Sequence, residues 1–277
     1  MDLSIEKIPV DTARAVRHAS PKNQRYINVG DKIHDLLAGW DVDQNDFAPE
    51  KPRYFILLLD LATIFQFVEK LTDAQTVEAI RTRVDWKYAL HLPLSYPGFD
   101  QIWLCRLRKY AMNSIAGIAV LQALTDRLAN ARIFDRSLEA AELVPSICLF
   151  NRIELVTTTM LLAVEALAVT DSAWLNHLPL TYLYEETART RRTMHELQTT
   201  EAMTRLANSI GVDIGKLLNS IQTSGEKNLI ELAEIQGLQD IWEKQYEWLN
   251  AGRLDERVFI WNPVDCHHCV FNVDSGL

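Results

Sequence analysis

Residues 52–110 read PRYFILLLDLATIFQFVEKLTDAQTVEAIRTRVDWKYALHLPLSYPGFDQIWLCRLRKY, and this stretch decides how the chain folds. Its first part, residues 54–71, is apolar almost all round. About 18 residues of this kind are too many for an ordinary strand and suit a helix that has neighbours on several sides. The sequence therefore predicts a buried helix at the centre of a domain.

A second helix is predicted directly after this one. Thr72 and Gln75 have the spacing of a capping box, in which each side chain satisfies an amide that the first helical turn leaves without a partner. The amphipathic segment that follows, residues 74–83, therefore forms a helix that begins at a sharp turn.

A third helix is predicted after a bend. Pro93 and Pro97 prevent a helix from continuing, because proline lacks the amide proton and clashes with the preceding turn. Asp100 then stands at an N-cap position, and a cationic helix follows from residue 101 to about residue 110. The predicted order is helix, turn, helix, bent loop, helix, which makes residues 52–110 a helix-turn-helix-like element.

The rest of the chain also favours helices. Leu, Ala, Glu, Gln and Arg dominate, and Val and Ile rarely alternate with polar residues, so strands have little support. The sequence predicts an all-α, multi-helix protein with a helical domain over residues 1–130 and a helical C-terminal region over residues 131–277 that ends in a short irregular tail. Further helices are expected over residues 111–131, over 137–148 with an interruption at Pro145, and over 151–169.

Composition limits the possible functions. The 277 residues carry a formal net charge of −9, so any contact with DNA would have to come from a local basic patch. Four cysteines do not make a disulfide framework. Residues 1–20 lack the apolar core of a signal peptide, and residues 54–68 are too few to span a bilayer and include Asp60. We expect a cytoplasmic, soluble protein without a cofactor.

The residue order in the central stretch resembles the N-terminal region of bacterial insertion-sequence transposases of the DDE superfamily, named for its catalytic acidic residues. The resemblance rests on YAL at 88–90, LPL at 92–94 and PGFD at 97–100, preceded by FQFVE at 65–69, LTD at 71–73, Gln75 and RTRVDWK at 81–87. Weaker matches are LFNRIE at 149–154 and IWEKQY at 241–246, so that the resemblance extends over roughly residues 12–265.

The resemblance implies a helical domain that helps to bind transposon ends, followed by a ribonuclease-H-like domain that cuts DNA with two metal ions. This chain departs from that plan. Counting back from Asn151 places Glu139 where the family has an Asp-Ser-Thr triplet, and Asp135 would fit only with an insertion of about four residues. The other acidic residues would lie beyond residue 277, and the strands of the catalytic sheet are absent from the pattern. Because two-metal chemistry needs several carboxylates, we expect no ribonuclease-H-like sheet, no catalytic residues and no transposase activity.

The candidate DNA contacts are the cations of the central stretch. They are Arg81, Arg83 and Lys87 around one bend, and Arg106, Arg108 and Lys109 on the third helix. Such cations could neutralise phosphates, with the third helix near the major groove; equally, they could solvate the outer face of an amphipathic helix. Family members tend to have small hydroxyl residues where this chain has Ile102, Trp103 and Cys105, which cannot donate to phosphates in the same way.

Two other clusters of charged or metal-binding residue types are not expected to form functional sites. Arg189, Arg191 and Arg192 resemble a solvated helix face with Glu185 and Glu186 as partners. Cys266, His267, His268 and Cys269 have the spacing of half a zinc site, but the second half is missing, so we expect no bound metal there.

Three functions remain as hypotheses. The first is a transposase-derived protein that binds double-stranded DNA without catalysis, at inverted repeats or as a regulator, and that could form a homodimer. The alternative is a helical interaction module that serves as a subunit of a larger complex, which the acidic balance favours. The third is a nuclease completed by carboxylates from another chain.

Overall fold

The computed structural model describes residues 7–19, 24–38, 47–134, 138–177, 200–248 and 257–259. It confirms the all-α prediction. Within these ranges the only strands are β1 (Tyr246–Trp248) and β2 (Arg257–Phe259), which form one short antiparallel ribbon. The chain divides into two compact units, Met1–Ile147 and Cys148–Leu277, whereas the sequence suggests a boundary between residues 130 and 131.

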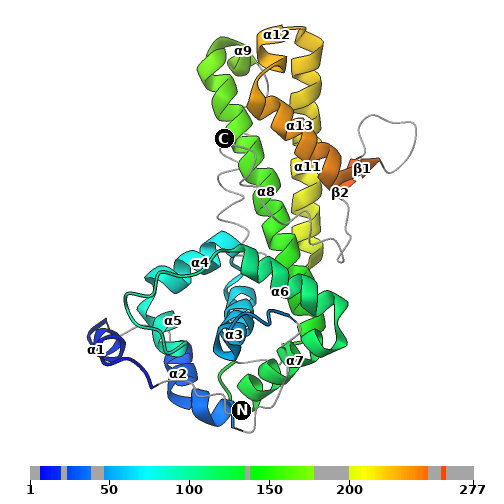
Figure 1. The fold of residues 1–277 in the computed structure, drawn as a ribbon. Helices are drawn as coiled ribbons and strands as arrows, with labels where there is room; N and C mark the ends of the chain where they lie inside the picture. Colours follow the sequence, from blue (N-terminus) through cyan, green and yellow to red (C-terminus); the bar gives the residue numbers. More distant parts are fainter. Residues whose placement is uncertain are drawn as a thin grey trace. The chain divides into compact units, whose positions relative to one another are not determined.

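Helices of the N-terminal unit surround a central one. In Figure 1, α3 lies in the middle of this unit with α2, α4, α5, α6 and α7 around it. Every residue of α3 from Ile56 to Gln66 is buried, as predicted for this apolar segment. The helices are α1 (Val10–Ala19), α2 (Gln24–Leu36), α3 (Arg53–Glu69), α4 (Asp73–Thr82), α5 (Val84–Ala89), α6 (Ile102–Asn113) and α7 (Ile115–Asn130).

The turn between α3 and α4 is built as the sequence predicts. Lys70 adopts a left-handed conformation (φ 54°) that ends α3. Thr72 then caps α4: its side chain accepts a hydrogen bond from the Gln75 amide at 3.4 Å, and its own amide donates to the Gln75 side chain at 2.9 Å. The capping box is therefore confirmed, and it fixes where α4 begins.

The segment between α4 and α6 differs in part from the prediction. The predicted bent loop contains the short helix α5, which is separated from α4 by the extended backbone of Arg83. The predicted N-cap is wrong by one residue, since the N-cap of α6 is Gln101, but the Asp100 carboxylate still accepts a hydrogen bond from the Ile102 amide at 2.9 Å. The helices α3, α4 and α6 are thus confirmed, while the helix-turn-helix-like element over residues 52–110 remains a prediction.

Two helix boundaries later in the chain also differ. The predicted helix over residues 111–131 is divided at Ser114, whose side chain caps α7 by accepting from the Gly117 amide at 3.3 Å. The predicted interruption at Pro145 is wrong, because α8 (Ala140–Thr170) is continuous. Pro145 lies in the second turn of α8, where the loss of one backbone hydrogen bond is tolerated by a helix whose flanking residues, Val144 and Ile147, are fully buried.

The C-terminal unit comprises the rest of α8 together with α9 (Ser172–His177), α11 (Thr200–Ser224), α12 (Lys227–Ile230) and α13 (Ala233–Gln245). The Nε of Arg152 donates to the side chain of Gln245 at 2.7 Å and so joins α8 to α13. By length and composition α8 could cross a membrane, a property that buried helices of soluble proteins share. The cytoplasmic location therefore remains a prediction.

Candidate nucleic-acid interface

The six cations predicted as DNA contacts fall into two groups, and the most buried of them is Arg108. Its side chain is 0% exposed. Its guanidinium donates to both carboxylate oxygens of Asp73, at 2.8 and 2.6 Å, and Gln66 donates to the same carboxylate at 2.7 Å. This pair joins α6 to the start of α4. Because Arg108 lies in the interior, it is not a surface contact, and the predicted set is corrected by its removal.

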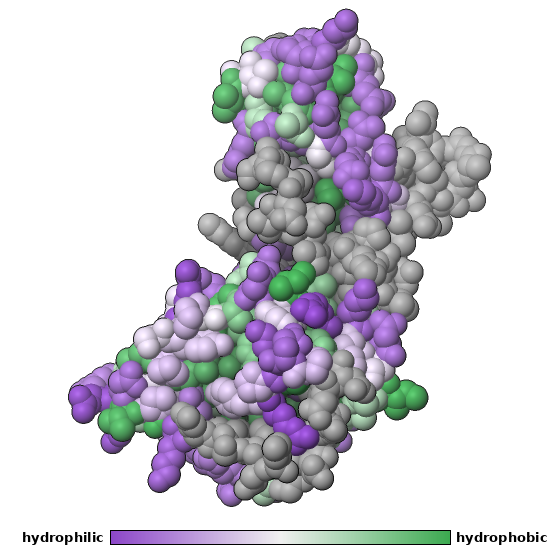
Figure 2. All heavy atoms as spheres, viewed as in Figure 1, coloured by the Kyte–Doolittle hydropathy of each residue, from purple (hydrophilic) through white to green (hydrophobic). Residues whose placement is uncertain are grey.

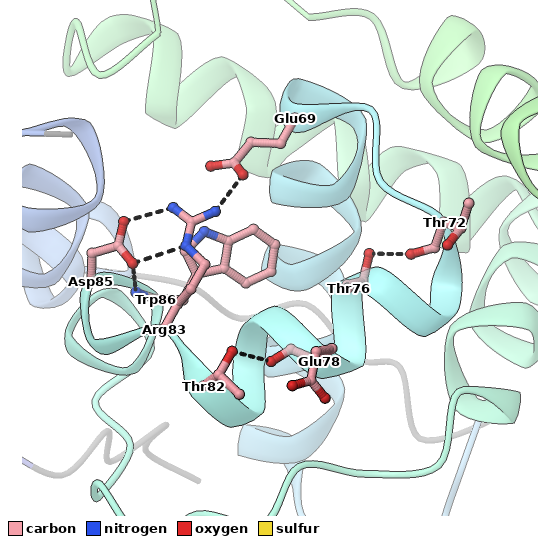
Figure 3. Close-up of polar contacts among 8 residues, drawn as sticks. All are labelled: Glu69, Thr72, Thr76, Glu78, Thr82, Arg83, Asp85 and Trp86. Carbon is pink, nitrogen blue, oxygen red and sulfur yellow. Dashed lines mark hydrogen bonds and ion pairs between the residues drawn. The ribbon is translucent and has the colours of Figure 1, made fainter. Parts of the chain in front are cut away.

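Arg83 forms ion pairs with two carboxylates of the same unit. Figure 3 shows its guanidinium between Glu69 and Asp85. It donates to Asp85 at 3.1 and 2.6 Å and also to Glu69, and it lies over the rings of Tyr26 and Trp86. Burial lowers the pKa of Arg83, but the hydrogen bonds to Asp85 and Glu69 outweigh it and raise the pKa above its ordinary value. The Arg83 charge is thus already neutralised by two acidic groups.

Lys87 holds the loop before α6 in place. Its ammonium donates to the backbone oxygens of Leu94 and of Tyr96, the latter at 3.1 Å, and the residue is buried. Burial lowers the pKa of Lys87. Lys87 therefore acts inside the fold, by fixing the bend that the prolines begin.

The other three predicted cations lie on the surface. Arg81 forms an exposed ion pair with Glu78 at 2.5 Å, a kind of pair that typically contributes little and exchanges readily with solvent ions. Arg106 and Lys109 are both exposed on α6, three residues apart, so they lie on one face of that helix. The exposed positions of α6 are Ile102, Arg106, Lys109 and Asn113.

The helix that carries this face has no acidic residue of its own. No acidic residue occurs in the sequence between Asp100 and Asp126, which covers all of α6 and most of α7. Three of the eight Lys and Arg in residues 52–110 are buried or lie between two carboxylates, so the surface charge of α6 comes from the exposed Arg106 and Lys109, in a chain with a net charge of −9. The exposed face of α6 is thus a local exception to an acidic protein.

A further cation, Lys51, lies beside this face and was missed by the sequence reasoning. Its Nζ is 4.8 Å from the centre of the Trp103 ring, and Cζ of Arg106 is 4.5 Å from the same centre. Phe55 packs edge-on against Trp103, with ring centres 5.5 Å apart. In the sequence Lys51 is marked only by its place directly before Pro52. Its contact with Trp103, 52 positions later, cannot be seen from neighbouring residues.

The remaining predicted clusters are not placed. The arginines at 189, 191 and 192 and the Cys266–Cys269 cluster lie outside the described residues. In the part of the chain that is described, no group of three or more His, Cys, Asp or Glu side chains could hold a metal ion. Comparisons with protein-family models, curated proteins and solved structures find no match to this chain.

Proposed function

We propose that the N-terminal unit binds double-stranded DNA through the exposed face of α6, as a transposase-derived module without catalytic activity. The observation that carries this proposal is the pair Arg106 and Lys109, which share one exposed face of a helix that contains no acidic residue. Cations placed in this way neutralise phosphates and release counterions, which is the main source of affinity for DNA.

The buried cations support the same proposal indirectly. Asp73 holds Arg108 and so fixes α6 against α4, while Lys87 fixes the loop that leads into α6. A helix that docks on DNA needs a rigid support on its inner side, because contacts to bases and phosphates depend on its orientation. The contact set is therefore Arg106 and Lys109, with Arg81 on α4 as a further phosphate contact.

The proposal is tested by a double substitution, Arg106→Ala with Lys109→Ala, measured against DNA of the chain's own locus including any flanking inverted repeats. The plot of log affinity against log salt concentration should lose about 0.9 in slope for each phosphate contact removed. Lys244→Ala is the control, since Lys244 is exposed on α13 of the other unit and forms an ion pair within its own helix with Asp240. Equal affinity and slope for the double variant and the control would remove α6 from the interface.

A second candidate function is a helical module that binds protein. It is favoured by exposed apolar side chains of this unit: Ile115 is 90% exposed at the start of α7, and Ile102 is 37% exposed at the start of α6. Figure 2 shows hydrophobic and hydrophilic residues side by side on the surface of the N-terminal unit. An Ile115→Ser variant that binds DNA normally but loses a co-purified protein would favour this second function.

A further inference from the structure

Trp103 brings together two cations that are far apart in the sequence. Lys51 comes from the turn before α3, and Arg106 comes from α6, one turn after Trp103 itself. Since both charges lie within 5 Å of the same ring centre, they are no more than about 10 Å apart, which is about one Debye length at 0.1 M salt. Charges this close together are near enough to contact neighbouring phosphates of one DNA strand.

The two charges are also available to a ligand. Among the residues that the structure describes, neither Lys51 nor Arg106 forms an ion pair with a carboxylate, in contrast to Arg83 and Arg108. Arg106 is exposed, and Lys51 is partly exposed. A cation over an aromatic face keeps its charge and its hydrogen-bond donors, while the ring restricts where the side chain can lie. The ring therefore lowers the entropy that each long side chain would lose on binding.

Neighbouring rings fix the position of Trp103. Phe55 and Phe47 both pack edge-on against it, at 5.5 and 6.4 Å between ring centres, and Lys51 also lies over Phe55 at 5.3 Å. The side chain that organises the two cations is thus itself held by residues from the turn before α3 and from α3. This arrangement is preformed and does not need the ligand to assemble it.

We propose that Lys51 and Arg106 form a two-cation site for the DNA phosphate backbone, organised by the ring of Trp103. The inference rests on the proposed function and extends the interface from α6 to the turn before α3. Lys51 is then a direct phosphate contact, and Trp103 is a positioning residue that acts through the two cations.

The test is a set of variants of the full chain, measured for DNA affinity across a range of salt concentrations. Lys51→Ala should reduce the salt slope by about 0.9, as expected for one lost phosphate contact. Trp103→Leu removes no charge but should weaken binding about two- to fivefold for each cation released. Trp103→Phe, which retains an aromatic face, should restore most of that affinity. Circular dichroism and urea unfolding identify any variant that fails to fold, and Lys51→Ala, at a surface position, remains informative in that case.

The outcomes separate this inference from the proposed function. Normal affinity and slope for Lys51→Ala, together with weakened binding by the Arg106 and Lys109 double variant, would overturn the two-cation site and leave the α6 interface intact. Equal affinities for Trp103→Leu and wild type would remove the organising role of the ring. Absence of any DNA binding by the wild-type chain would overturn both proposals.

Discussion

Arg108 and Asp73 form a buried, bidentate ion pair between α6 and the first residue of α4, with N–O distances of 2.8 and 2.6 Å. Arg106, two positions earlier on the same helix, points to solvent and lies over Trp103. On this one helix, the buried Arg108 fixes the position of α6, whereas the exposed Arg106 remains available to an anion. Stability and binding should accordingly respond to different residues.

Arg108→Ala should lower the free energy of unfolding by about 3–5 kcal/mol, because it leaves the Asp73 carboxylate buried without its main partner. Replacing both residues, as Arg108→Met with Asp73→Leu, should lower the free energy of unfolding by less than Arg108→Ala does, because no buried charge is left without a partner. Arg106→Ala is the control, and we expect its free energy of unfolding to stay within about 0.5 kcal/mol of the wild-type value. Urea unfolding measures all three. Equal stability of Arg108→Ala and Arg106→Ala would contradict the buried pair.

Thr72→Ala should destabilise the protein by about 1 kcal/mol, because it removes the side-chain half of the capping box at the start of α4. Thr82 provides a control in the same helix: it is exposed, and its hydroxyl donates to the Glu78 backbone oxygen within α4 (Figure 3). Thr82→Ala should change the unfolding midpoint little. A loss as large for Thr82→Ala as for Thr72→Ala would show that the cap is not the cause.

Gly211→Ala should destabilise the C-terminal unit by about 1–3 kcal/mol. A Cβ at this position of α11 would lie 2.2 Å from the ring of Tyr246, whose hydroxyl is held by the Ala207 backbone oxygen at 2.9 Å. Gly237→Ala on α13 is the matched control, since its added Cβ meets nothing within 4 Å. That change should stabilise by about 0.4–1 kcal/mol. Thermal unfolding that shifts both variants in the same direction would contradict this packing.

Stability should fall above pH 10. Burial and the hydrogen bond to Asp31 raise the pKa of Tyr88 to about 12, and burial raises the pKa of Tyr26 and of Tyr246 still further. In the unfolded chain these phenols ionise near pH 10. The folded state therefore holds more protons than the unfolded state between pH 10 and 12, and its stability decreases as the pH rises through that window.

Tyr88→Phe isolates one of these groups. The decrease in unfolding free energy between pH 9 and pH 11.5, measured by urea unfolding, should be smaller in this variant than in wild type. An identical decrease in the two proteins would mean that Tyr88 ionises equally easily in the folded and unfolded states.

Local patterns in the sequence predicted much of this fold. The apolar run at residues 54–71 became the buried helix α3, and Thr72 with Gln75 became the observed capping box, because both depend on neighbours within a few positions. The predicted interruption at Pro145 was wrong, because the sequence shows the missing amide proton but not the tertiary packing that stabilises α8 around it.

The candidate site was harder to predict, because it depends on contacts between distant positions. All six cations look alike in the sequence, and only the fold shows that Asp73, 35 positions away, binds Arg108. The same holds for Lys51, which becomes informative only beside Trp103. Helical periodicity identified a cationic segment, but it could not tell which of its members face inward.

The most direct test is binding of the purified full chain to DNA from its own locus, with flanking inverted repeats, at 50 and 200 mM salt. We expect binding at the lower concentration that weakens steeply at the higher one, with a slope set by the phosphates engaged, and a shallower slope for the Arg106→Ala and Lys109→Ala double variant. An absence of binding at 50 mM salt would contradict the DNA-binding function and leave the protein-binding module as the explanation.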